Sequence, residues 1–97
     1  MLSLEKTLKR SDDIIAREID GSYLLIPIAA GVGEQEDELF TVNEMGRRIW
    51  EEVDGQKTLA QIRDCLKTEF EVEQSELELD LLGFANELYA RQILIDA

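Results

Sequence analysis

The side chains that could do chemistry in this chain are mostly carboxylates, and none stands at the spacing of a known site. Glu36-Asp37-Glu38 is the longest uninterrupted acidic run and could bind a hard cation weakly, but its spacing fits no calcium-binding loop. The pairs Asp12-Asp13 and Glu51-Glu52 are typical of solvated surface. Acid pairs are common in a chain with 22 acidic and 10 basic residues, so none of them by itself indicates catalysis.

Other reactive groups are scarce. The chain contains no histidine, which removes the usual zinc ligand, the usual general base and any serine–histidine triad. Its single cysteine, Cys65, excludes an internal disulfide, and we expect it to be a small core residue. Gly31 and Gly33 form G-x-G without a third glycine, which is not a nucleotide-binding fingerprint. We therefore expect no catalytic residues, no metal site and no cofactor.

Length and charge restrict the partners. Ninety-seven residues make one domain, with little room for both a core and a deep cleft. The formal net charge of −12 opposes binding to nucleic acid and to an anionic membrane. Six acids and no base lie between Glu69 and Asp80. This stretch either binds a basic peptide or basic protein face or is a solvated surface that keeps the protein soluble.

The sequence also indicates where the protein is located. No apolar run reaches the roughly 18 residues of a membrane span. Met1-Leu2-Ser3-Leu4 is too short for the core of a signal peptide. We therefore expect a cytoplasmic protein.

The elements that must position any binding site begin with strands. Branched residues over 14–19 and an apolar run over 22–28 flank Asp20-Gly21, and Asp-Gly between two such runs is a strong signal for a β-hairpin. A polar connection over 29–38 leads to a third strand at 39–42. We expect an antiparallel meander whose edges are the first and third strands.

The residues before the hairpin are harder to interpret. Residues 1–13 lack a clear period, and we expect them to be an N-terminal arm, either loose or forming a short helix. The single domain then spans residues 14–97.

Three helices are predicted after the strands. The proposed caps are Asn43 for the first, Thr58 with Gln61 for the second, and Ser75 with Glu78 for the third, the last two as capping boxes. Gly46, in the first turn of the first helix, either lets another element approach closely or is merely tolerated. Ile93-Leu94-Ile95 is expected to add a short closing strand.

The third helix has two apolar sides. Its principal stripe consists of Leu77, Leu81, Phe84, Ala85 and Leu88. An advance of 100° per residue places Leu79, Leu82, Asn86 and Tyr89 on an adjoining side. That second side either packs on the sheet or binds a partner. The whole pattern predicts an α+β, winged-helix-like fold of three antiparallel strands followed by three helices.

Several short motifs, taken in order, resemble the PqqD family of RiPP recognition elements, where RiPP denotes a ribosomally synthesised and post-translationally modified peptide. The motifs are Val42-Asn43, Ile49-Trp50, Asp54-Gly55, Thr58-Leu59 with Ile62, Phe70, Phe84, Leu88 and Ile93-Leu94. Arg17, Ile19 and Leu24-Leu25 fit the family's opening hairpin more loosely, so the resemblance covers about residues 12–95. Arg91-Gln92 stands where a glycine often precedes the last apolar pair.

The resemblance implies a winged-helix-like fold and a non-catalytic role. Family members bind the leader of a precursor peptide and present it to a modifying enzyme, often of the radical-SAM class, as in pyrroloquinoline quinone biosynthesis. The peptide adds as a strand to the third strand and lies along the third helix. On this chain the expected peptide-binding residues are Leu39, Phe40 and Thr41 of the strand and, from the helical wheel, Leu79, Leu82, Asn86 and Tyr89.

Two other functions stay open at this point. A winged-helix nucleic-acid binder is one, although the acids at 76, 78 and 80 oppose the approach of a recognition helix to phosphates. A subunit that only stabilises a larger enzyme is the other. The sequence does not fix the oligomeric state, and a homodimer stays open.

Overall fold

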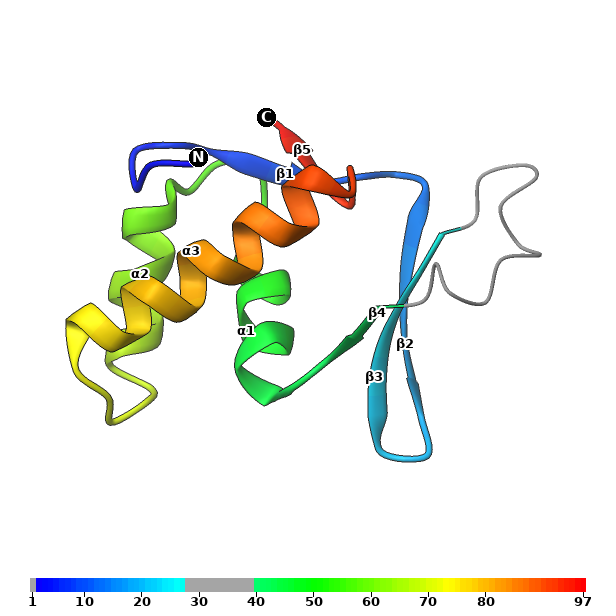
Figure 1. Ribbon diagram of the computed structural model, residues 1–97, viewed down its shortest axis with the longest axis horizontal. Coiled ribbons are helices and arrows are strands. Elements are labelled where there is room, and N and C mark those ends of the chain that lie inside the picture. The colour runs from blue at the N-terminus through cyan, green and yellow to red at the C-terminus, as the bar shows by residue number, and fades with distance from the viewer. Residues whose placement is uncertain (1, 28–39) are drawn as a thin grey trace.

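The computed structural model of the chain describes residues 2–27 and 40–97. The strands are β1 (Leu8–Arg10), β2 (Ile14–Ile19), β3 (Ser22–Pro27), β4 (Phe40–Val42) and β5 (Leu94–Asp96), and the helices are α1 (Glu44–Glu52), α2 (Leu59–Lys67) and α3 (Gln74–Ala90). In Figure 1 the three helices pack together, and β2, β3 and β4 extend from them as a separate layer. The predicted α+β, winged-helix-like architecture is confirmed.

The main sheet is the expected antiparallel meander, in the order β2-β3-β4. Ile19 pairs with Ser22 across the two-residue turn, whose residues Asp20 and Gly21 have φ values of 51° and 81°, as a type I′ turn requires. Pro27 is the last residue of β3, a position where proline is tolerated. Residues 28 and 39, expected in these strands, lie outside the described residues.

The N-terminal residues are part of the fold rather than a loose arm or a short helix. β1 pairs antiparallel with β5, and the side chain of Leu8 is buried. The Ser11 N–H donates to the carbonyl of Ile93 at 3.0 Å. The predicted closing strand is thus confirmed. Its partner was missed because a three-residue strand with one buried side chain has no period that a sequence pattern can reveal.

The first two helices begin at their predicted caps. The Asn43 side chain accepts a hydrogen bond from the Gly46 N–H at 2.8 Å. Thr58 and Gln61 form both hydrogen bonds of a capping box. These caps satisfy N–H groups that have no partner within the helix, so they fix the start of each helix.

The predicted capping box of the third helix is wrong. α3 begins at Gln74 and has Glu73 as its N-cap, without a side-chain cap bond, so Ser75 already lies inside the first turn. Glu78 accepts instead from the Arg63 guanidinium at 2.6 Å. Packing of α3 against α2 therefore uses the carboxylate that the capping box needed.

The core is formed by one side of each helix together with single residues from the strands. Its fully buried members are Leu8, Leu25, Ile49, Val53, Leu59, Ile62, Leu66, Leu77, Leu81, Ala85, Leu88 and Leu94. Cys65, expected in this core, is exposed. It lies outside the arc of Leu59, Ile62 and Leu66 that already fills the buried side of α2.

The end of α3 shows how Gln92 takes the place where the PqqD family often has a glycine. This residue has φ 63°, a left-handed conformation that glycine adopts more easily. The N–H of the following Ile93 donates to the carbonyl of Leu88 at 2.9 Å, as in a Schellman motif. The chain therefore makes the turn that the family makes with glycine, and both Ile93 and Leu94 are buried after it.

Candidate functional site

β4 has a free edge. Residues in an antiparallel pair alternate between exchanging two hydrogen bonds and exchanging none, and the pair that flanks a two-residue turn exchanges them. The pair Ile19–Ser22 exchanges hydrogen bonds, so along β3 the residues Ser22, Leu24 and Ile26 bond to β2, while Tyr23 and Leu25 bond to β4. Their partners in β4 are Val42 and Phe40. The N–H and C=O of Thr41 therefore point away from the sheet, where an extended peptide can pair with them.

α3 forms a wall beside this edge. The ring of Phe40 meets the ring of Phe84 edge to face, with centroids 6.3 Å apart and planes at 71°. The Arg91 guanidinium lies 5.1 Å from the centre of the Phe40 ring, and Glu87 holds it at 3.5 Å from the other side. The side of α3 that faces β4 thus carries an aromatic ring and a cation.

A small hollow continues this wall toward the start of α1. Its volume is about 190 Å³, and Asn43, Met45, Gly46, Ile49, Asp80 and Phe84 line it. A Cβ on Gly46 would lie 2.9 Å from Cε1 of Phe84. Gly46 therefore does let another element approach closely, since the missing side chain makes room for the aromatic ring. The hollow is apolar at its base and has one carboxylate, that of Asp80, on its lining.

Two of the four helix residues predicted from the sequence, Asn86 and Tyr89, form hydrogen bonds away from β4. Asn86 accepts from the Leu2 N–H at 2.9 Å and donates to the carbonyl of Leu82 at 2.8 Å. The Tyr89 hydroxyl lies 3.2 Å from the carboxylate of Asp96 in β5. Asn86 and Tyr89 thus lie on the flank of α3 that faces the N-terminal segment and β5, whereas Phe84 lies on the flank that meets Phe40 of β4.

The remaining predicted peptide-binding residues are one leucine of α3 and the residues of the third strand. Leu79 is 74% exposed and contacts neither β4 nor the core. Leu39 lies outside the described residues. Phe40 and Thr41 are both at the edge, on opposite faces of the strand.

Sequence reasoning missed Phe84 and Arg91 for a specific reason. A helical wheel defines two flanks on either side of the buried stripe, but it does not tell which flank faces a given strand. Phe84 was counted in the stripe, and it is only partly buried. An aromatic residue at the border of a stripe is the signal that could have indicated this flank.

The acidic stretch from Glu69 to Asp80 is partly neutralised. Glu69 receives the Arg48 guanidinium at 2.6 Å, a hydrogen bond that lowers the pKa of this carboxyl. Glu78 pairs with Arg63 at 2.6 Å. The four remaining acids form no ion pair with a described residue; they are Glu71, Glu73, Glu76 and Asp80. These four acids therefore give the N-terminal half of α3 and the residues just before it a negative potential.

The described residues, 2–27 and 40–97, hold neither a cluster of metal ligands nor a membrane-spanning helix. No cluster of three or more side chains that could ligate a metal ion occurs there. No helix in that part of the chain is long and apolar enough to cross a membrane.

An open strand edge beside a helix, on a winged-helix-like α+β scaffold, defines a small domain that can bind an extended peptide. The chain belongs to the PqqD family: the family model described as coenzyme PQQ synthesis protein D matches residues 24–94. This confirms the resemblance carried by the sequence motifs. β1 and β2 lie outside the matched residues.

A solved structure gives a more specific likeness. It is TbiB1 in complex with the TbiA(beta) leader peptide, and it is similar to this chain with a TM-score of 0.69 and 27% sequence identity over 89% of this chain and 93% of that one. No curated protein matches the chain.

Proposed function

We propose that this protein is a non-catalytic adaptor, which binds the leader of a ribosomally synthesised precursor peptide and presents it to a modifying enzyme, in pyrroloquinoline quinone or related RiPP biosynthesis. The observation that carries the proposal is the open β4 edge facing Phe84 and Arg91, on a fold shared with TbiB1, whose structure holds a leader peptide. A radical-SAM enzyme in the cytoplasm is the proposed recipient.

The leader adds to the sheet as a strand next to β4. Its backbone pairs with the N–H and C=O of Thr41, so its side chains alternate between the two sheet faces. Those on the face of Phe40 and Val42 meet Phe84, Arg91 and the hollow beside Gly46. Those on the other face stay uncovered by the domain, and this is the face that an enzyme can reach.

The energetics place most of the affinity in the side chains. Two backbone hydrogen bonds at Thr41 contribute about 0.5–1.5 kcal/mol each, whereas micromolar binding needs roughly 8 kcal/mol. An apolar side chain buried in the hollow contributes about 1.5–3 kcal/mol. We therefore expect a leader with apolar residues at alternate positions, seated against Phe40 and Phe84. One copy of the domain carries both the edge and the wall, so the mechanism needs no homodimer.

The test is a calorimetric titration with a synthetic peptide that covers the N-terminal half of a precursor, sought among the short open reading frames beside this protein's gene. Thr41→Pro removes the outward N–H without breaking a bond to β3. We expect it to weaken binding about tenfold or more, because the lost pairing also misplaces the side chains. Thr41→Val keeps the N–H and should bind like the wild type.

Circular dichroism separates lost binding from lost folding in these variants. Equal affinity for the wild type and Thr41→Pro would remove β4 from the site. Absence of leader binding together with tight binding to duplex DNA at low salt would favour a nucleic-acid-binding winged helix instead. A stable complex with the enzyme but no affinity for the leader would favour a structural subunit.

A further inference from the structure

The opposite edge of the sheet, β2, has more unused backbone than β4. Because hydrogen-bonded pairs alternate from Ile19–Ser22 onward, the residues of β2 that bond to β3 are Ile15, Arg17 and Ile19. The backbone groups of Ile14, Ala16 and Glu18 therefore face away from the sheet. Among the described residues, the Ile14 N–H donates to the Ser11 carbonyl at 3.3 Å, and no backbone bond reaches the outward groups of Ala16 and Glu18. A further strand can pair with these two residues.

Three cations near this edge have no ion-pair partner among the described residues. Six of the ten Lys and Arg side chains form ion pairs with described carboxylates. Three of the remaining four are Lys9, Arg10 and Arg17, on β1 and β2; the fourth is Lys67 on α2. Asp12 and Asp13, between β1 and β2, also form no ion pair with a described residue, so three cations and two carboxylates of this corner can meet a partner.

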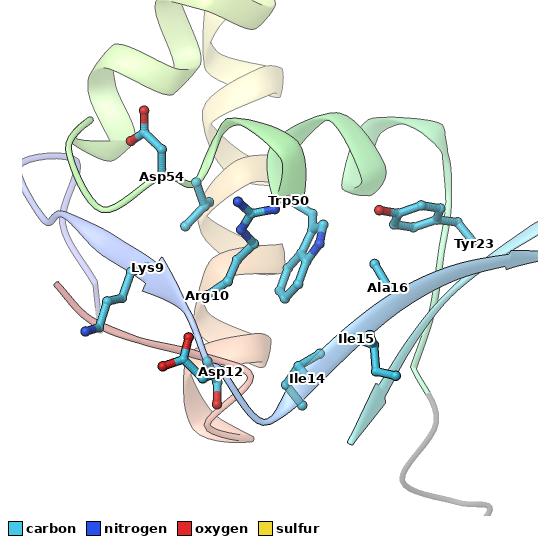
Figure 2. A pocket seen from close by; sticks show the side chains of 11 residues that line it. Lys9, Arg10, Asp12, Ile14, Ile15, Ala16, Tyr23, Trp50 and Asp54 are labelled. Carbon is cyan, nitrogen blue, oxygen red and sulfur yellow. The ribbon is translucent and has the colours of Figure 1, made fainter. Parts of the chain in front are cut away.

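A groove runs along the same edge. It has a volume of about 460 Å³ and lies between β1, β2 and α1. Figure 2 shows Arg10 reaching from β1 toward Trp50 of α1, with Ile14 and Ala16 of β2 across from it. The Arg10 guanidinium lies 5.7 Å from the centre of the Trp50 ring. The groove therefore combines apolar side chains of β2 and α1 with a cation that stacks on an aromatic ring and has no carboxylate partner among the described residues.

The carboxylate of Asp54, which also lines the groove, is committed elsewhere. It accepts the N–H groups of Gln56 and Lys57 at 2.9 and 3.0 Å, and the Lys57 ammonium lies 3.0 Å away. It thus closes the turn between α1 and α2. The Asp12 carboxylate also lines the groove, but no ion pair within the described residues joins either carboxylate to Arg10.

We propose that the β2 edge and its groove form a second binding site, which takes an extended acidic segment of a partner protein. A strand added to β2 places alternate side chains on the two sheet faces. Acids on one face meet Arg10 in the groove, and acids on the other face meet Arg17. The site lies across the sheet from β4, so it stands independently of the proposed function.

The test uses a defined probe, the acetylated and amidated peptide Thr-Val-Glu-Val-Thr, followed by two-dimensional ¹⁵N NMR and by the fluorescence of Trp50, the only tryptophan of the chain. We expect saturable shifts of the Ala16 and Glu18 amides and a change in Trp50 emission. The peptide with glutamine in place of glutamate should bind about tenfold more weakly, since a charge-assisted hydrogen bond is lost.

Matched variants locate the site. Arg10→Glu should abolish the shifts, whereas Lys67→Glu makes the same charge change on α2 and should leave them intact. Ala16→Pro removes an outward N–H and should abolish binding, and Ala16→Ser should retain it.

Three outcomes would overturn the proposal. The first is equal binding of the glutamate and glutamine peptides. The second is a response confined to Thr41 and α3. The third is a wild-type dimer in sedimentation that Ala16→Pro converts to a monomer, because a second copy would then occupy the edge.

Discussion

The two edges of the main sheet offer the same backbone groups in different surroundings. β4 has three residues, one of which points its backbone outward, and an aromatic wall on α3 stands beside it. β2 has six residues, three of which point outward, and it borders a groove with unpaired cations. Backbone pairing is sequence-independent, so the neighbouring side chains decide which peptide each edge can select.

Charge separates the edges further. The side of α3 near β4 carries unpaired acids, of which Asp80 lines the hollow. The corner near β2 carries unpaired cations, of which Arg10 lines the groove. The two proposals together therefore place two extended partners of opposite charge on the two edges of one small sheet.

The largest expected effect concerns the close contact beneath the β4 site. In Gly46→Val the new side chain would overlap Phe84, since even a Cβ lies 2.9 Å from its ring and 3.2 Å from Val42 Cβ. We expect a loss of about 1–3 kcal/mol in the free energy of unfolding and weaker leader binding, because Phe84 must move.

Gly83→Val is the control for that variant, since no atom lies within 4 Å of a Cβ at this helical position. Urea titrations of both variants measure the difference. The acidic probe at the β2 edge should bind Gly46→Val as it binds the wild type. A loss at both edges would show that they are coupled through α1.

A smaller effect is expected from the acid beside the β4 site. Asp80→Asn should weaken leader binding about two- to fivefold at low salt if the acidic side of α3 attracts a basic leader. The difference should disappear near about 0.5 M salt, where screening shortens the reach of charges. Asp12→Asn makes the same change near the other edge and should leave leader affinity unchanged. A salt-independent affinity would return these acids to the role of a solvated surface.

The smallest effect concerns Asp54. Hydrogen bonds from the Lys57 and Gln56 N–H groups, together with the Lys57 ammonium, hold the pKa of this carboxyl well below its ordinary value of 3.8. A lowered pKa in the folded state stabilises the fold above the unfolded pKa, and this contribution is lost as the pH falls below it. We expect Asp54→Asn to be less stable than the wild type at about pH 6 and the difference to shrink toward about pH 2.

Unfolding curves at both pH values, with Asp13→Asn as the control, measure this. The affinity of the acidic probe should be the same for Asp54→Asn and the wild type. A tighter complex with Asp54→Asn would mean that this carboxylate competes for Arg10.

The sequence predicted those features that depend on neighbours along the chain. The Asp20-Gly21 hairpin, the Asn43 cap and the Thr58 capping box each involve residues at most three positions apart. The Ser75 box fails because a distant residue, Arg63, takes the carboxylate of Glu78. Local signals hold where no tertiary contact competes for the same group.

The candidate site was predicted only in part, for the same reason. The meander makes the first and third strands edges, and the resemblance to the PqqD family selects the third, with Phe40 and Thr41. The flank of α3 that meets the strand depends on how the helix is rotated over the core, and no local pattern records that rotation. β1 escaped notice because its stability comes from β5, more than eighty residues away along the chain.

The pairing of β1 with β5 has a consequence for how this domain can be joined to others. Leu8 lies opposite Asp96, and Figure 1 places both chain ends at one corner, above the helices and away from the β2–β3 turn. A domain whose ends lie together can be inserted into a loop of a larger protein without stretching either connection. The same corner lets a tether of few residues carry the domain while both sheet edges stay accessible.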